Sequence, residues 1–265
     1  MIAKRTGAGL LVCLTILTAL AAVVAPRVAQ PLSYHQFADA RAVYGIANFL
    51  DVVSNLPFAI FGPWGLWFLA QQASAKAFLD SRERWPYVTL FIGILLTAFG
   101  SGYYHRMPNN SRLVWDRLSM TIAFMSLVAA MIAERIDVTI GVRLLPPLLC
   151  LGILSVLQWQ LTEQRGVGDL RFYAAVQVYA IAVLLLLLLL PPRYTRTSDL
   201  VWVGVFYLLA KLFEAFDRSI FSLGHQFVSG HTLKHLAAGM SGYFLLRMLQ
   251  KRVPIASQIR IPDAA

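Results

Sequence analysis

Charged residues are scarce in this 265-residue chain, at 14% of the sequence, whereas soluble domains contain roughly 25%. Acidic residues are the scarcest, with 13 Asp and Glu against 23 Lys and Arg, and 58% of the residues are hydrophobic. This composition excludes an ordinary soluble domain and indicates an integral membrane protein. The basic residues are scattered singly between apolar runs, without a stripe or a recognition motif, so they do not indicate a nucleic-acid partner.

Cysteine is almost missing. Cys13 and Cys150 both lie inside apolar segments, which excludes a disulfide framework. The alternating ten-residue pattern of a membrane barrel and any clear internal repeat are also missing. Helices are therefore the expected structure, because lipid cannot satisfy open backbone groups.

Apolar runs long enough to cross a bilayer recur along the whole chain. The predicted helices cover residues 6–25, 49–71, 87–105, 114–134, 139–161, 172–190, 200–216 and 231–249. The connections between them are too short for a second domain. The sequence therefore predicts a single all-α membrane domain over residues 1–265.

The first apolar run could be read as a cleaved signal peptide, because Lys4 and Arg5 precede it. Pro26 follows Ala25 directly, which is unfavourable at a cleavage site, and the run is long enough to span a membrane. We therefore expect a retained helix. With eight helices, both ends of the chain lie on the same side of the membrane.

Basic residues are distributed unequally between the two sides of this topology. The side that holds both termini has thirteen of them: Lys4, Arg5, Lys76, Arg82, Arg84, Arg135, Arg143, Arg193, Arg196, Arg247, Lys251, Arg252 and Arg260. The other side has seven: Arg27, Arg41, Arg106, Arg112, Arg165, Arg171 and Arg218. The positive-inside rule then predicts a multi-pass protein with both termini in the cytoplasm and residues 250–265 as a basic cytoplasmic tail.

Polar residues gather on the outer side of this topology. Ser101 and His105 are four residues apart in GSGYYH, and so are His231 and His235 in HTLKH, so each pair shares one helical face. His105 ends the third predicted helix, Asp116 lies at the start of the fourth, and the other two histidines begin the eighth. Three separate segments therefore bring ionisable groups to one membrane depth.

Three imidazoles from two helices, with one position left for water, are the ligand set of a catalytic zinc site. No cysteine or carboxylate cluster accompanies the histidines, so other metals fit less well. HTLKH differs from the metalloprotease HExxH because Thr232 stands in the position of the catalytic Glu. The base must come from elsewhere, and Asp116 is the carboxylate at the right depth.

Each of these residues also has a simpler interpretation. Ser101 lies between Gly100 and Gly102 and could serve close helix packing. His105 could reach toward interfacial water, and Asp116 could stabilise the start of a helix. Together the simpler interpretations weaken, because ionisable groups inside membrane segments are costly and usually functional.

The pattern GSGYYH, ten residues, Asp116 and, much later, HTLKHLAAG resembles the alkaline ceramidases, membrane amidases of the superfamily that includes the progestin and adiponectin receptors. The stretch NFLDVVSNLPF at residues 48–58 is similar to that family's first helix. The resemblance covers residues 34–249, which implies a seven-helix bundle of ceramidase type preceded by one extra helix. The receptor branch has a longer histidine-to-aspartate spacing, so the ceramidase branch fits better.

Residue by residue, the resemblance implies zinc ligands at His105, His231 and His235. It also implies that Ser101 stabilises the oxyanion and that Asp116 acts as the acid and base.

The chain departs from the ceramidase pattern at several positions. Eukaryotic ceramidases have an acidic calcium site before the first family helix, whereas this stretch offers only Asp39 and the neutral Asn48. A Ca²⁺ site is not expected here, because affinity for hard cations follows ligand charge. Lys234 replaces an aromatic residue, and Arg117 replaces an acidic one, so the substrate is left open.

Further polar residues can be placed only loosely. Lys211, Glu214 and Asp217 are three apart and are expected to share one helical face. They could pair within the bundle or, alternatively, steer a histidine ligand. His35 and His225 lie in connections and are expected at the surface.

The sequence as a whole predicts a zinc-dependent hydrolase of the amide bond of ceramide-like membrane lipids, which releases a fatty acid and a long-chain base. The metal would activate water, Asp116 would move the protons, and Ser101 would stabilise the oxyanion. A receptor-like or structural seven-helix protein with a non-catalytic zinc site is the alternative. A transporter fits less well because inverted repeats are missing. Acyl-chain preference and oligomeric state stay open.

Overall fold

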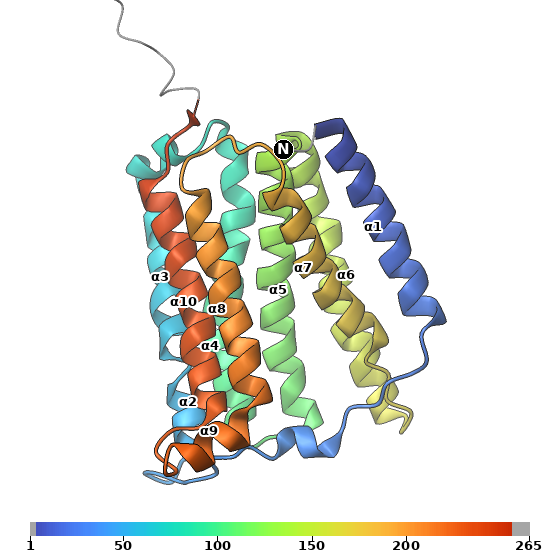
Figure 1. Cartoon of the computed structure of the whole chain (residues 1–265), viewed down its shortest axis with the longest axis vertical. Coiled ribbons are helices and arrows are strands. Elements are labelled where there is room, and N and C mark those ends of the chain that lie inside the picture. Colours follow the sequence, from blue (N-terminus) through green and yellow to red (C-terminus); the bar gives the residue numbers. More distant parts are fainter. Residues whose placement is uncertain (1–3, 256–265) are drawn as a thin grey trace, which may run out of the picture.

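The structure, a computed structural model, describes residues 4–255, and this part of the chain is all-helical (Figure 1). The α-helices are α1 (Lys4–Val24), α2 (Phe49–Val53), α3 (Leu56–Ala70), α4 (Arg84–Arg106), α5 (Asn110–Arg135), α6 (Val138–Gln164), α7 (Arg171–Leu188), α8 (Thr197–Ala215), α9 (Asp217–Leu223) and α10 (Gly230–Lys251). Short 3-10 helices cover Leu32–His35, Gln72–Ala77 and Ser81–Glu83.

Side-chain caps fix the starts of three long helices. The carboxamide oxygen of Asn109 accepts a hydrogen bond from the Arg112 amide at 2.9 Å at the start of α5. Asp137 caps α6 in the same manner. Ser229 caps α10, because its hydroxyl accepts from the Thr232 amide at 3.0 Å. These caps satisfy amides that the first turn of a helix leaves without a partner.

The long helices run along one axis of the molecule and form a bundle (Figure 1). α5 contacts α4, α6 and α7, and α10 packs against α3 and α8. α1 lies at the edge of the bundle and packs mainly against α7. Cys13 on α1 and Cys150 on α6 are both free and exposed.

All eight segments predicted from the sequence are helical, and six of the described helical segments are long and apolar enough to cross a membrane. α8 and α10 are the two long helices outside that group. α8 carries Asp199, Lys211 and Glu214, and α10 begins with the polar sequence GHTLKH. The helices that fall short in apolar character are therefore rich in ionisable side chains.

The start of the predicted basic tail belongs to the bundle. α10 continues to Lys251, and the side chain of Arg252 is buried. Its guanidinium donates to the carbonyl of Ala77 at 2.9 Å and forms an ion pair with Glu134. Arg252 is therefore held in the bundle by an internal carboxylate. Residues 256–265 of that tail lie outside the described residues.

The start of α1 and the end of α10 lie at the same end of the bundle (Figure 1).

Candidate metal centre and adjoining cavity

The three predicted histidines lie together in the interior. His105 is in the last turn of α4, and His231 and His235 begin α10. Their exposed fractions are 0%, 4% and 3%, and their ring centroids are 4.7 to 4.8 Å apart. One nitrogen from each ring lies within 4.8 Å of the other two. The expectation that these residues meet and could bind a metal ion is confirmed.

The spacing of the histidine nitrogens fits a metal ion. The Nε2 atoms of His105 and His231 are 3.3 Å apart. Two nitrogens at about 2.0–2.1 Å from a tetrahedral zinc lie about 3.3–3.4 Å from each other. Within the described part of the chain this group contains no fourth His, Cys, Asp or Glu. Three neutral nitrogen donors with one position left open are the donor set of a catalytic zinc site.

A shell of polar residues orients the histidine-bearing segments. The hydroxyl of Ser54, at the end of α2, lies 2.8 Å from Nδ1 of His235. The carboxamide of Asn48 donates to the carbonyl of His105 at 2.7 Å. Asp51 accepts hydrogen bonds from the hydroxyls of Ser229, at 3.2 Å, and Thr232, at 2.8 Å. A hydrogen bond to the second ring nitrogen fixes the tautomer of a ligating histidine, so Ser54 orients His235 for binding through Nε2.

These supporting residues were not assigned roles from the sequence. Asn48, Asp51 and Ser54 follow one another at intervals of three, which places them on one side of the first turns of the segment 49–70. The signal in the sequence was this polar face at the start of an otherwise apolar helix.

Ser101 and Asp116 lie next to each other and next to the histidines. Ser101 is one turn before His105 on α4, and Asp116 is on α5. Both are buried, with exposed fractions of 2% and 7%. Both side chains line the same cavity as His235.

The close contact between α4 and α5 depends on Gly100 and not on Ser101. A Cβ atom on Gly100 would lie 2.5 Å from the carbonyl oxygen of Trp115, so only glycine fits there. Gly102 has no such neighbour within 4 Å. Ser101 itself lines the cavity, so the two neighbouring residues have different surroundings.

The cavity beside the histidines is apolar and elongated. Its volume is about 220 Å³, and α4, α5, α7, α8 and α10 all contribute to its lining. Ser101, Asp116 and His235 mark one end, and Met131 and Leu188 lie toward the other. Asp116 and Met131 are about 15 residues apart on α5, a rise of roughly 22 Å. A cavity of this shape and lining can hold a hydrocarbon chain with its polar end at the histidines.

Charged residues of α8 and α10 form a second polar cluster next to the site. Glu214 accepts hydrogen bonds from Lys211 and from Lys234, the latter at 2.7 Å. The ammonium of Lys234 also lies 3.4 Å from Nε2 of His231. The predicted pairing of Lys211 with Glu214 is present.

Asp217 does not share their helical face, because α8 ends at Ala215. Its carboxylate instead accepts from the backbone amide of His231 at 2.8 Å and from that of Ala38 at 2.9 Å. Asp217 thus positions the start of α10, which is the supporting role that the sequence left open as an alternative.

The connection between α1 and α2 covers the outer face of the histidines. The ring of Phe37 lies 4.7 Å from that of His105 and 4.4 Å from that of His231. His35 does not lie free at the surface as predicted, because its ring nitrogens contact the hydroxyl of Tyr104 at 2.9 Å and the carboxamide of Asn110 at 2.8 Å. Access to the histidines from this side therefore requires this segment to move.

Asp39 and Asn48, the two residues of this stretch that were considered for a calcium site, both bind other parts of the protein. Asp39 binds Arg41 through two hydrogen bonds of 2.7 Å, and these hold the pKa of the Asp39 carboxyl below its usual value. Asn48 binds the His105 carbonyl, as described above. The two side chains therefore serve the local structure of this connection.

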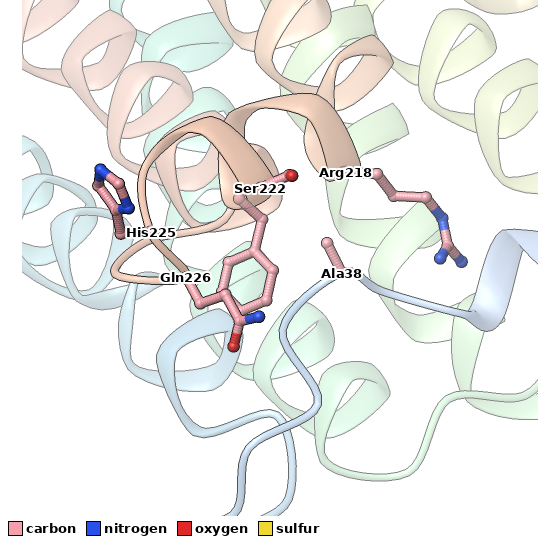
Figure 2. A pocket seen from close by; sticks show the side chains of 6 residues that line it. Ala38, Arg218, Ser222, His225 and Gln226 are labelled. Carbon is pink, nitrogen blue, oxygen red and sulfur yellow. The ribbon is translucent and has the colours of Figure 1, made fainter.

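A second hollow lies at the surface beside α9 (Figure 2). Ala38, Arg218, Phe221, Ser222, His225 and Gln226 line it, and its volume is about 510 Å³. It is wide open, and its polar side chains do not converge on one point (Figure 2). His225 is exposed, as predicted. The larger hollow therefore lacks the convergent groups of a binding site, and the smaller cavity beside the histidines has them.

Comparison of the chain with protein-family models and with curated proteins finds no match.

Proposed function

We propose that this protein is a membrane-embedded, zinc-dependent hydrolase of the amide bond of ceramide-like lipids, similar to the alkaline ceramidases. The helices from α2 to α10 form the seven-helix catalytic unit, in which α2 and α3 count as one membrane segment and the short α9 is not counted. Helix α1 is an additional membrane helix, and both termini face the cytoplasm. One observation carries the proposal. Three buried imidazoles lie close enough together to hold a metal ion, and one of them, His235, lines the polar end of an apolar cavity with Ser101 and Asp116.

A zinc ion at these nitrogens would supply Lewis-acid chemistry, because it lowers the pKa of coordinated water and polarises an amide carbonyl. His105, His231 and His235 would hold the ion, and Ser54 keeps His235 in the tautomer that this requires. Asp217 keeps His231 in place through the first turn of α10.

Asp116 is placed to move the protons. It lies at the head of the cavity, where the amide of a lipid with its acyl chain along α5 would stand. As a carboxylate it accepts a proton from the attacking water and passes it to the nitrogen of the leaving amine. The Ser101 hydroxyl, which lines the cavity with Asp116, donates to the oxygen that becomes negative as the carbonyl is attacked.

The cavity favours a lipid over a soluble amide. Its lining beyond Thr97, Ser101, Asp116, Lys234 and His235 is almost wholly apolar over the roughly 22 Å between Asp116 and Met131. Burying a hydrocarbon chain there is favourable by about 0.8 kcal/mol for each methylene removed from water.

The test is the release of fatty acid from a panel of lipid amides and esters by the purified protein in detergent, followed by mass spectrometry. We expect amide cleavage that requires zinc and that Asp116→Asn abolishes. A protein that binds one zinc and cleaves none of the amides would instead have the non-catalytic zinc site of a receptor-like or structural protein.

A further inference from the structure

Arg117 is a buried cation without a countercharge. It follows Asp116 on α5, and 5% of it is exposed. One terminal nitrogen, Nη2, donates to the side-chain oxygen of Gln30, and the other, Nη1, is buried with no hydrogen-bond partner. Among residues 4–255, no carboxylate lies within ion-pair distance of it. A buried charge with an unused donor is costly unless something else binds it.

The other deeply buried arginines differ from Arg117. Arg252 also has a terminal nitrogen, Nη2, without a hydrogen-bond partner, but its charge is paired with that of Glu134. Arg135 has no carboxylate partner, but it donates to the carbonyl of Leu190 at 2.9 Å and to the hydroxyl of Thr197 at 3.3 Å. Its two terminal nitrogens therefore both have acceptors, whereas Arg117 keeps Nη1 free.

Aromatic rings surround the guanidinium of Arg117. Its central carbon lies 4.0 Å from the ring centroid of Trp159, 4.6 Å from that of Tyr173 and 5.9 Å from that of Tyr34. Rings that lie against the face of a guanidinium stabilise its charge, and they leave its edge free for a planar anion. The three rings therefore hold the guanidinium of Arg117 in place without neutralising its charge.

This aromatic site adjoins the head of the cavity. Arg117 directly follows Asp116 on α5, and Asp116, Tyr207 and Lys234 line the cavity. Tyr34 connects Arg117 to the Lys234–Glu214 pair, because its hydroxyl lies 3.5 Å from Glu214. A lipid with its acyl chain in the cavity and its amide at Asp116 must place its head group outside the apolar part, on the side of these residues.

We infer that Arg117 binds an anionic group on the head of the lipid substrate, so that the substrate is an N-acyl lipid whose amine part carries a carboxylate or a phosphate. The inference rests on the proposed function for the position of the amide. A neutral head group would leave the guanidinium unpaired, whereas an anion would supply the acceptor that Nη1 lacks.

The reaction with such a lipid is an ordinary hydrolysis. The oxygen of water bonds to the acyl carbon, the bond from that carbon to nitrogen breaks, and the nitrogen takes a proton. The products are a fatty acid and an amine that retains the carboxylate or phosphate.

Three lipids with the same acyl chain test the inference on the full-length protein. N-oleoyl glycine and N-oleoyl ethanolamine differ in the carboxylate, and the phosphate ester of N-oleoyl ethanolamine supplies the second anion. We expect kcat/KM to be about 10- to 100-fold higher for at least one anionic lipid than for the neutral one, the usual effect of a hydrogen bond to a charged group. The anionic lipid that is preferred identifies the head group.

Arg117→Gln should remove this preference, and Arg117→Lys should retain part of it because the charge stays. Arg112→Gln is the matched control, since Arg112 is a half-buried arginine on the same helix that packs on Tyr103, and it should leave the ratio unchanged. The wild-type ratio decides the question even if the Arg117 variants fail to fold. Equal kcat/KM values for the three lipids in the wild type would overturn the inference.

Binding to Asp116→Asn separates this inference from the proposed function. That variant should bind N-oleoyl glycine, or the phosphate ester, about 10- to 100-fold more tightly than N-oleoyl ethanolamine, whether or not the wild type cleaves any of them. If the wild type cleaves none of the lipids but the variant binds the anionic ones more tightly, the proposed hydrolase is refuted and the anion site remains. Equal binding of the three lipids would refute the anion site.

Discussion

The hydroxyl of Ser54 lies 2.8 Å from Nδ1 of His235, although 181 residues separate the two in the chain. This contact joins the end of α2 to the second turn of α10 and fixes the orientation of one imidazole. Outer hydrogen bonds of this kind typically change metal affinity by about 10- to 100-fold. Ser54→Ala should therefore weaken zinc binding by about that factor, as measured by competition with a chelating dye. Ser222→Ala, at an exposed serine on α9, should leave the affinity unchanged.

The purified protein should contain about one zinc per chain, because three neutral nitrogen donors converge at one point. Replacement of His105, His231 or His235 with Ala should remove most of the metal, as measured by elemental analysis. His225→Ala is the control, since this histidine is exposed beside α9 and should not change the metal content. Full occupancy in all three site variants would end the zinc assignment.

Removal of the metal with a chelator should abolish hydrolysis, and added zinc should restore it.

Asp116→Asn should lower turnover by about 10² to 10⁴ while zinc stays bound, because the amide keeps the size of the side chain but cannot accept a proton. Turnover and zinc content measured on the same sample check this. Loss of zinc together with activity would make Asp116 a ligand or the support of one. Full turnover with full zinc would remove it from the mechanism.

Ser101→Ala should lower turnover by about 10² to 10³ with little change in substrate affinity, because its hydrogen bond to the oxyanion matters mainly in the transition state. Steady-state kinetics separate the two effects. Ser126→Ala is a matched control, since Ser126 is a buried serine on α5 whose hydroxyl has no hydrogen-bond partner. Unchanged turnover in Ser101→Ala would return Ser101 to a role in helix packing.

The unequal distribution of basic residues predicts the orientation of the bundle. A reporter fused to the C-terminal end of the chain should be cytoplasmic, and one inserted near Asn110 should lie on the opposite side. A reporter at the N-terminal end should match the first. Termini on opposite sides would mean that the segment Lys4–Val24 does not span the membrane or is removed.

The sequence predicted the helices and the meeting of the three histidines for simple physical reasons. A run of apolar residues must form a helix in lipid, and alternating helix directions bring the end of α4 and the start of α10 to the same end of the bundle. These two facts place His105 and His231 at the same end of the bundle, and the packing of the helices then brings their rings into contact.

The contacts made by the connections could not be predicted in this way. The position of Phe37 against two histidine rings depends on the path of the chain between α1 and α2, and local spacing does not determine that path. The same applies to Asp217, whose role depends on the end of α8 at Ala215 and the separate helix α9. The burial of Arg252 depends likewise on its partner Glu134, which is distant in sequence.

Two of the three candidate ligands come from the last helix of the chain. Chains are synthesised from the N-terminus and their segments fold in that order. His231 and His235 are therefore made long after His105, when almost the whole bundle has been synthesised. A chain interrupted between α8 and α10 would contain most of the apolar helices and no metal centre. Acquisition of the ion would therefore be a late step of biogenesis, and bound metal would mark the chains whose synthesis and assembly are complete.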